Sequence, residues 1–402
     1  MTSRVLYITQ NGIADHIGRS QIAPYLIGLA RSGQKIHILS AEKALNRGLI
    51  ESYETIFKQA DIEWTRVAYR NSLRVVHPIL TQLCLFWAAV RIVRRNAIAW
   101  VHCRSHPAAL IGFLIKFLCR KPYVFDFRDF YVDCGREQFS GIRGLIYLGL
   151  ARLEEPMLKQ ATCVVCLTER AKSILESKGV KNLFVIPCCA DFEHFDIQRV
   201  SQTELIRARQ NIDLSEDDFV MLYLGSLGFD YLLTEMLMLF KQLCMIKDDA
   251  KLLFVSNNGE QLVRAALPQY DIADSDVRFV MATREQIPAF MAMARLSVVF
   301  IRPTLSKAGC SPTKLAELFA ANIPVIANAG VGDLDRIIDL DSNGSTLVAN
   351  FSNHSLKTAI LRVLELQSIT PVNIRENMRE FDLEEGIRRY LRVYRQMDAV
   401  SC

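Results

Sequence analysis

The residues between 301 and 327 have types and spacing that suit the binding of an anion. A helix is expected to start near Pro312, after a loop of small residues, with Ser311 as its N-cap. The free N–H groups of the first turn, the helix dipole and the Lys314 ammonium together predict a site for a diphosphate. Glu317 follows one turn later, where its carboxylate could accept hydrogen bonds from a ribose diol. The alternative is an ordinary capped helix with Lys314 in solvent.

Other candidate binding residues follow the ends of predicted strands. Gly18 and Arg19 come after the first strand, where a glycine permits close approach of a ligand and an arginine could add positive charge. Gly225 and Ser226 have the corresponding position after the first strand of the second half, and Arg302 ends a later strand. Arg19 is equally compatible with an ordinary surface position at the start of a helix.

Two further pairs of polar residues are expected to face the same site. Arg104 and His106 follow a short predicted strand, and Arg128 and Asp129 follow a buried one, so both pairs should lie at the carboxyl edge of a sheet. Arg128 or Asp129 could orient the hydroxyl groups of a substrate. The alternative for this second pair is a salt-bridged rim. His102, by contrast, is expected to pack near the sheet.

Alternating strands and helices position these residues. Val5–Thr9 is predicted to be a strand, Gln10–Arg19 a loop and Ser20–Ser32 a helix. A second strand at Lys35–Ser40 completes a βαβ unit, which favours a parallel sheet with helices on both faces. Later strands are expected at Trp100–Cys103, Tyr123–Phe127, Val164–Leu167, Leu183–Ile186, Val220–Leu224, Lys251–Val255, Val277–Phe279, Leu296–Phe300 and Val325–Ile326.

The length of 402 residues suggests two domains, each able to bury its own core. The expected division is an N-terminal domain at 1–190, a second domain at 191–372 and a charged helical segment at 373–402. A polar, irregular stretch after Pro187 is expected to act as the linker.

Charge is distributed unevenly along the chain. Residues 1–190 contain 26 Lys and Arg against 14 Asp and Glu, whereas residues 191–402 contain 22 against 29. The basic half suggests an anionic partner such as nucleic acid, phospholipid or a polyanionic acceptor. A solvated surface without such a partner is the alternative.

The cysteines and the apolar runs indicate the compartment. Eleven cysteines, an odd number, favour a reducing environment, and Cys163 and Cys166 lie in a predicted buried strand rather than in a redox or metal site. A strand that begins at Arg4 leaves no room for a signal peptide, and no apolar run reaches the length of a membrane span. A cytoplasmic protein, peripheral at most to a membrane, is expected.

Two apolar segments end in basic residues. Leu83–Arg95 combines Leu, Phe, Trp and Val with three arginines near its end, and Ile111–Lys121 has a similar composition. They could rest on an anionic bilayer, with Trp87 at the interface. The alternative is a pair of core helices with a basic outer edge.

The stretch around Glu317 resembles the retaining GT-B glycosyltransferases of family four. The motif of that family is Glu, seven residues, a second Glu, and a helix that ends in Gly-x-Pro-Val-Ile. Glu317 matches the second Glu and Asn322–Ile326 matches the tail, whereas the first Glu falls on Gly309. Here the chain is similar to a sub-branch that reads Ser-Pro-Thr-Lys-Leu-x-Glu.

The resemblance covers nearly the whole chain. Val185–Asp191 is similar to the family's segment between the domains, and Phe381–Glu385 resembles the start of the segment that crosses back onto the first domain. The Arg and Lys that many relatives have after the first strand of the donor domain are missing here. Positive charge for the diphosphate would then come from Lys314, Arg302 and Lys307.

The resemblance implies an α/β protein of GT-B fold, with two Rossmann-like doubly wound parallel-sheet domains and a C-terminal helix that crosses back to the first. It implies a hexosyltransferase-type enzyme that moves a sugar from a nucleotide-diphosphate-sugar donor to a glycan or lipid-linked acceptor in surface polysaccharide biosynthesis. No metal, cofactor or nucleic acid is expected. A GT-B nucleotide-sugar epimerase and a non-catalytic GT-B-like subunit that binds an anionic partner are the alternatives. The residues assigned to catalysis are His106, Arg104, Arg128 and Asp129, and those assigned to donor binding are Gly18, Arg19, Gly225, Ser226, Arg302, Ser311, Pro312, Thr313, Lys314 and Glu317.

Overall fold

A computed structural model describes residues 3–69, 76–138, 141–369 and 372–401 of the chain. The chain forms two compact units. Unit 1 consists of Met1–Cys188, Ala308–Ser311 and Leu383–Cys402, and unit 2 of Cys189–Lys307 and Pro312–Asp382. The C-terminal helix and a four-residue segment from the second half of the sequence therefore belong to the first unit.

Unit 1 is built on a seven-stranded sheet in the order β3-β2-β1-β4-β5-β6-β7, in which every pair is parallel. Its central strands are buried, as the continuous apolar run Cys163–Cys166 requires of a strand covered on both faces. The strands are β1 (Arg4–Thr9), β2 (Lys35–Glu42), β3 (Glu63–Ala68), β4 (Ile98–Arg104), β5 (Tyr123–Asp126), β6 (Cys163–Cys166) and β7 (Leu183–Val185).

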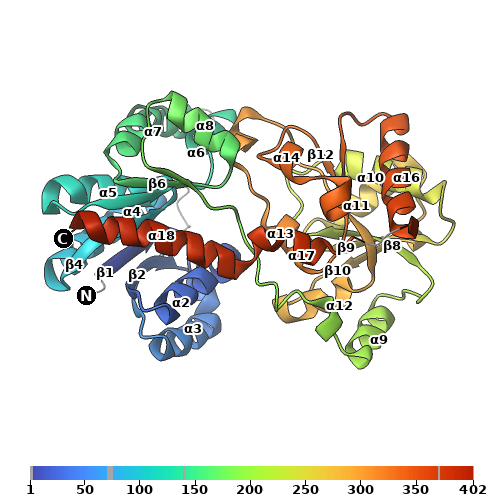
Figure 1. The fold of residues 1–402 in the computed structure, drawn as a ribbon, viewed down its shortest axis with the longest axis horizontal. Helices are drawn as coiled ribbons and strands as arrows, with labels where there is room; N and C mark the ends of the chain where they lie inside the picture. The colour runs from blue at the N-terminus through green and yellow to red at the C-terminus, as the bar shows by residue number, and fades with distance from the viewer. Residues whose placement is uncertain (1–2, 70–75, 139–140, 370–371, 402) are drawn as a thin grey trace. The chain divides into compact units, whose positions relative to one another are not determined.

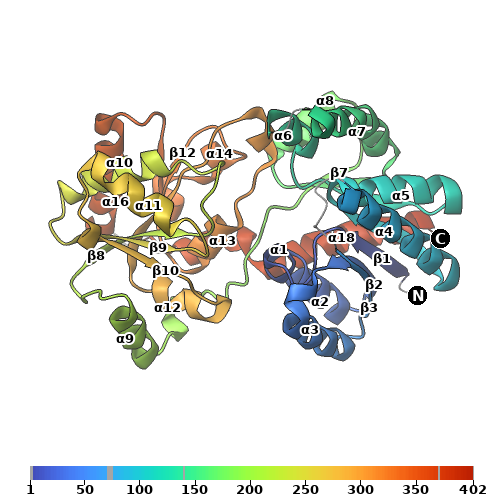
Figure 2. The same cartoon turned by 180° about the vertical axis from the view of Figure 1, so that it is seen from behind.

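Helices cover both faces of this sheet. Because right-handed crossovers from β1 to β2 and from β3 to β4 run in opposite directions along the sheet, α2 and α4 lie on opposite faces. α4 and α5 pack side by side, and α18 packs against α2 and β4 (Figures 1 and 2). The α-helices of this unit are α1 (His16–Gln21), α2 (Ala23–Arg31), α3 (Arg47–Gln59), α4 (Val76–Arg95), α5 (Ser105–Cys119), α6 (Tyr131–Gln138), α7 (Gly141–Gln160), α8 (Glu169–Ser177) and α18 (Leu383–Ser401).

Unit 2 contains a six-stranded parallel sheet in the order β10-β9-β8-β11-β12-β13. Its strands are β8 (Phe219–Leu224), β9 (Ala250–Val255), β10 (Val277–Val280), β11 (Ala294–Val299), β12 (Val325–Asn328) and β13 (Thr346–Val348). Its α-helices are α9 (Gln202–Asn211), α10 (Leu233–Cys244), α11 (Glu260–Ala266), α12 (Ile287–Met291), α13 (Thr313–Ala320), α14 (Leu334–Ile337), α15 (Leu340–Asn343), α16 (Asn353–Ile369) and α17 (Ile374–Asn377). Short 3₁₀ helices are η1 (Ala44–Asn46), η2 (Ile197–Arg199), η3 (Leu267–Tyr270), η4 (Asp274–Asp276), η5 (Arg284–Gln286), η6 (Leu305–Gly309) and η7 (Arg379–Phe381).

Two doubly wound parallel sheets confirm the predicted fold class, and three local predictions were wrong. The helix expected at Ser20–Ser32 is interrupted at Ile22, because Pro24 in the next turn has no N–H to continue it. The preceding helix α1 starts at His16, so Gly18 and Arg19 lie in a helix and not in a loop. The expected linker contains α9, whose capping box of Ser201 and Glu204 was overlooked.

The C-terminal helix α18 is fixed to unit 1 by polar contacts at the sheet. The Tyr394 hydroxyl lies 2.9 Å from Nδ1 of His102, and Trp100 Nε1 donates to Asp398 at 2.8 Å. The predicted return of the C-terminal helix to the first domain is therefore confirmed. Among the described helices, none has both the length and the apolar character needed to cross a bilayer.

Candidate active site

Most of the residues predicted for donor binding lie in unit 2. They follow the carboxyl ends of its strands, near the point where the strand order of the six-stranded sheet reverses. From β8 the chain proceeds to β9 and β10 on one side and to β11, β12 and β13 on the other, so the reversal lies between β8 and β11. Open parallel sheets bind ligands beyond the carboxyl ends of the strands at such a point. Gly225 and Ser226 follow β8, and Arg302 lies at the start of the segment that leads from β11 to α13.

Lys314 lies in the first turn of α13, and its side chain is buried. Its ammonium is 4.5 Å from the centre of the Tyr223 ring and 4.0 Å from that of the Tyr231 ring. The same Nζ lies 3.3 Å from the Tyr223 hydroxyl. Since aromatic faces attract and orient a cation, the positive charge is held at a fixed position beside the start of α13. The alternative in which Lys314 extends into solvent is therefore wrong.

Gly225 lies beside this ammonium. Its φ of +108° favours glycine, and a Cβ built there would lie 3.1 Å from Nζ of Lys314. Asn258 braces the loop that follows, since its side chain accepts from the Leu227 N–H at 2.9 Å and donates to the Leu227 carbonyl at 2.7 Å. Ser226 is exposed on this loop. The structure thus brings Gly225, Ser226 and Lys314 together.

Glu317 lies one turn beyond Lys314 and is half-buried. Its carboxylate accepts no hydrogen bond and forms no ion pair within the described part of the chain. Burial raises the pKa of Glu317, although the charges of Arg284 and Lys314 act in the opposite direction. Because neither carboxylate oxygen of Glu317 accepts a hydrogen bond from these residues, both oxygens can accept hydrogen bonds from a ligand.

The first turn of α13 has no side-chain cap. Pro312 is the N-cap residue, with Thr313 as the first helical residue, and no side chain accepts from the first N–H groups. Ser311 was wrongly predicted as the cap, because its hydroxyl accepts the Cys188 N–H at 3.0 Å instead. The Leu315 N–H donates to the Pro312 carbonyl at 3.0 Å, and the dipole of α13 favours an anionic ligand near this end of the helix.

The other two cations of this region have different surroundings. Arg302 is exposed, and its guanidinium lies 4.7 Å from the centre of the Phe229 ring. Lys307 pairs with Asp230 at 3.0 Å, so its charge is already compensated. Of the three cations proposed from sequence, Lys314 is the one at the start of α13.

Unit 1 has a reversal of its own, between β1 and β4. Gly18 lies there, but a Cβ on it would be 2.1 Å from the Gly12 carbonyl oxygen, so the chain's own backbone already requires this glycine. In the loop after β1, the Ile13 N–H donates to Glu42 at 2.6 Å. Arg19 has a buried Nε without a partner among the described residues.

Arg104 and Arg128 converge on one buried carboxylate. Asp126 lies 3.6 Å from Arg104 and 3.4 Å from Arg128, and Gln21 Oε1 accepts from the two guanidinium groups at 2.9 and 3.3 Å. Burial alone would raise the pKa of Asp126, but Arg128, His102 and Arg104 hold it well below its usual range. Two guanidinium groups against one carboxylate leave this cluster with an excess of positive charge.

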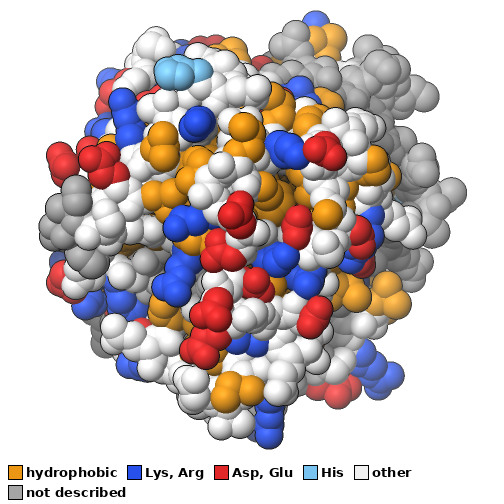
Figure 3. All heavy atoms as spheres, turned by 90° about the vertical axis from the view of Figure 1, so that its right-hand side faces the viewer, with side chains coloured by type: hydrophobic (Ala, Val, Ile, Leu, Met, Phe, Trp, Pro, Cys, Tyr) orange, Lys and Arg blue, Asp and Glu red, His pale blue; other side chains and the backbone are white. Residues whose placement is uncertain are grey.

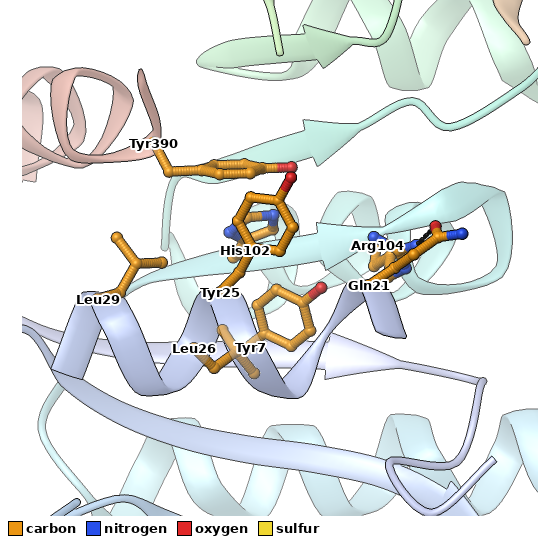
Figure 4. Close-up of a pocket in the computed structure, with 8 residues that line it drawn as sticks. All are labelled: Tyr7, Gln21, Tyr25, Leu26, Leu29, His102, Arg104 and Tyr390. Atoms are coloured by element: carbon orange, nitrogen blue, oxygen red, sulfur yellow. Dashed lines mark hydrogen bonds between the residues drawn. The ribbon is translucent and has the colours of Figure 1, made fainter. Parts of the chain in front are cut away.

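A small cavity adjoins this cluster. Figure 4 shows the rings of Tyr7, Tyr25 and Tyr390 gathered around His102, with Arg104 reaching Gln21 beside them. The volume of about 10 Å³ is near the minimum for one water molecule. Burial lowers the pKa of His102 and raises that of Tyr7 to about 12, so both groups are neutral at neutral pH. The cavity is part of the α18 interface and is too small for a sugar.

His106 is fully enclosed, so the expectation that it faces an open site was wrong. Its Nε2 lies 2.9 Å from Glu154 of α7, and the Tyr131 ring stacks on it at 5.4 Å. Asp129 is partly exposed and lies beside Gly309, where a Cβ would be 3.5 Å from the Asp129 Cα and 3.3 Å from the Phe130 ring. This packing limits position 309 to a small residue.

Two family models match the sequence. Residues 26–194 match the model described as Glycosyltransferase Family 4, and residues 206–381 match Glycosyl transferases group 1. This chain is a glycosyltransferase of the GT-B fold. No curated protein matches the sequence of this glycosyltransferase.

Solved structures share the fold over the whole length of the glycosyltransferase. Sucrose-phosphate synthase from Thermosynechococcus elongatus is 16% identical with a TM-score of 0.70, and the match covers 99% of this chain and 100% of that one. Anabaena Alr3699/HepE in complex with UDP and glucose is 16% identical with a TM-score of 0.68, covering 97% and 99%. The lipopolysaccharide outer core galactosyltransferase WaaB is 11% identical with a TM-score of 0.63, covering 96% and 98%.

Several residues around the candidate sites give little signal in the sequence. Arg284 acts on Glu317 from η5, and Tyr223 and Tyr231 flank Lys314, yet none of them belongs to a motif. Ser105 has a φ of +64° directly after β4, in a region that costs free energy for any residue other than glycine. Only Gln21 could have been noticed, as a polar residue on the inward side of a helix.

Proposed function

We propose that this glycosyltransferase moves a sugar from a nucleotide-diphosphate sugar to a glycan or glycolipid acceptor, with retention of configuration, in the assembly of a surface polysaccharide. The observation that carries the proposal is the carboxylate of Glu317, which has no partner of its own and lies one turn beyond a fixed ammonium. The HepE structures in complex with UDP and UDP-glucose support a nucleotide sugar as donor.

In the proposed complex the donor diphosphate binds to the first turn of α13 and to Lys314. Glu317 accepts hydrogen bonds from the ribose, and the loop at Gly225 and Ser226 approaches the phosphates through its backbone. Negative charge grows on the diphosphate as the glycosidic bond breaks, and fixed N–H groups and an ammonium stabilise it without having to reorganise. The departing phosphate is proposed to assist attack by the acceptor on the same face of the sugar.

The reaction is proposed to need no metal or other cofactor. A cytoplasmic location with peripheral contact to the membrane suits a lipid-linked acceptor, and the excess of basic residues in the first half of the sequence supports it. The cation for the diphosphate is then Lys314.

A thermal-shift screen across nucleotides and their sugar conjugates tests the proposal. We expect at least one nucleoside diphosphate and its sugar conjugate to raise the melting temperature by several degrees, because a ligand at about 100 times its Kd stabilises by about 2.7 kcal/mol. The protein is then incubated with that donor alone. Conversion of the sugar without an acceptor would indicate an epimerase, and no stabilisation by any nucleotide sugar would indicate a non-catalytic subunit.

Replacing Gly225 with alanine should weaken donor binding. The new Cβ would lie 3.1 Å from Nζ of Lys314 in a backbone conformation with φ of +108°, so both the loop and the ammonium must shift. We expect a loss of about 1–3 kcal/mol of stability and a rise in the donor Kd, measured by thermal unfolding and calorimetry. Gly228→Ala on the same loop is the matched control, because no atom lies within 4 Å of its Cβ. Equal donor affinity in the two variants would contradict the assignment of this loop.

A further inference from the structure

One side of α4 is apolar although it faces solvent. The buried side packs into the core of unit 1 through residues such as Leu85 and Ala89. On the other side Leu83 is 49% exposed and Trp87 is 67% exposed, and Ile79 and Leu80 extend the same stripe toward the start of the helix. Single exposed apolar side chains are ordinary, but a continuous stripe marks an interaction surface.

The exposed stripe continues onto α5. Phe117 is 62% exposed and Leu118 is 58% exposed near the end of that helix. α4 and α5 lie side by side (Figure 2), and Gln82 of α4 donates a hydrogen bond to the Pro107 carbonyl of α5. Because both helices run antiparallel to the parallel strands, this contact aligns Phe117 with the last third of α4. We define the α4–α5 face as the exposed residues of the two helices together with Arg120, which directly follows α5; they are Ile79, Leu80, Leu83, Trp87, Leu114, Phe117 and Leu118, with Arg91, Arg94, Arg95 and Arg120.

The charge of this face has one sign. Between Trp64 and Phe125 the sequence contains ten Lys and Arg and no Asp or Glu. Arg91, Arg94 and Arg95 follow the apolar stripe of α4, and no ion pair is found for them in the described part of the chain. The face of unit 2 in Figure 3 is different, because acidic and basic side chains are mixed across it.

We propose that the α4–α5 face docks on an anionic lipid bilayer. The apolar side chains of the two helices enter the boundary between headgroups and acyl chains, and the arginines contact lipid phosphates. A helix surface with an apolar stripe, an interfacial tryptophan and an arginine-rich flank has the composition of an interfacial membrane helix. This inference rests on the proposed function, because it names the surface that makes the proposed membrane contact. Vesicle binding can nevertheless be measured without donor or sugar transfer, so the two proposals can fail separately.

Charge complementarity favours a bilayer over a protein partner. Arginine is common at protein interfaces, where its charge needs an acceptor on the partner, and here three arginines directly continue the apolar stripe. In a self-associated pair these arginines would have no acidic residue of the α4–α5 face to meet, since the face contains none. An anionic bilayer supplies phosphates next to an apolar layer, and it matches both features.

Flotation with vesicles tests the proposal on the full chain without donor. We expect binding to phosphatidylcholine mixed with phosphatidylglycerol, reduced by salt, and little binding to phosphatidylcholine alone. Replacing Arg91, Arg94 and Arg95 with glutamine should lower the affinity by about 100-fold at low salt, and Trp87→Ser with Phe117→Ser by about tenfold or more. The matched control replaces Arg388, Arg392 and Arg395 of α18 with glutamine, so that it loses the same number of positive charges as the α4 variant. α18 packs against α2, on the other side of the sheet from α4.

Two results would overturn the assignment of this face. Affinity for the anionic vesicles that is the same in the α4 variants and in the α18 control would mean that only overall charge matters. A wild-type dimer that Trp87→Ser and Phe117→Ser turn into a monomer, without vesicle binding, would mean that the face joins two copies. Nucleotide-dependent stabilisation of each variant verifies its fold, and a Lys314→Ala chain that has lost this stabilisation should still bind vesicles.

Discussion

Replacing Lys314 with alanine is expected to raise the donor Kd and lower the rate of transfer, each by about 100-fold, the scale of a lost charge-assisted contact. The ammonium lies between two aromatic rings beside the uncapped start of α13, so no other described cation can replace it there without moving the loop. Glu317→Ala should have a similar effect, because its carboxylate is expected to hold the ribose. Calorimetry with the donor and initial rates with an acceptor measure both effects.

The stability of the Glu317 variant separates binding from misfolding. Burial raises the pKa of Glu317 in the folded protein, so the fold loses stability as the pH rises through that pKa. Glu317→Gln removes this loss and should leave the melting temperature of the ligand-free protein unchanged or higher at neutral pH, while donor affinity falls. Lys357→Ala, at an exposed position of α16, is the control for the loss of a lysine. Donor affinity near that of the wild type in both the Lys314 and Glu317 variants would remove the assignment.

Much of the fold follows from local patterns in the sequence. Buried strands such as β6 and β8 are unbroken apolar runs, and a parallel sheet covered by helices requires such runs. The edge strand β3 is not predicted because its sequence, Glu63–Ala68, is neither an unbroken apolar run nor a strict alternation, and Glu63 and Arg66 are half-exposed in this short segment. Local patterns therefore identify the centre of each sheet better than its edges.

The site could be predicted only where its residues are neighbours in sequence. Lys314 and Glu317 were found because a helix start places them one turn apart. The partners that decide the role of a side chain are often far along the chain. Glu154 encloses His106 from 48 residues away, and Tyr223 holds Lys314 from 91 residues away. No periodicity or spacing carries such information, so a strand-end histidine and a buried one look the same in the sequence.

The buried cluster around Asp126 leads to the second large expected effect, which is on stability. Asp126→Asn should lower the free energy of unfolding by about 3–5 kcal/mol, since two buried guanidinium groups would lose their one carboxylate. The Tyr390 hydroxyl of α18 also donates to Asp126, at 3.2 Å. Hydrogen exchange should therefore rise first in α18, and urea unfolding measures the total loss. Glu51→Gln, which removes one exposed ion pair with Arg47, is the control and should change little.

The pH dependence of the Asp126→Asn variant tests whether the charge of Asp126 stabilises the fold. The pKa of Asp126 lies well below its usual range in the folded protein, so its stabilisation is complete above the ordinary range of a carboxyl group and is lost as the pH falls toward the folded pKa. The stability difference between the wild type and Asp126→Asn should therefore be largest near neutral pH and shrink in acid. Adding Arg104→Met to Asp126→Asn should recover part of the loss, because one uncompensated charge is then removed. A difference that stays constant from neutral to acid pH would show that Asp126 contributes through packing and not through its charge.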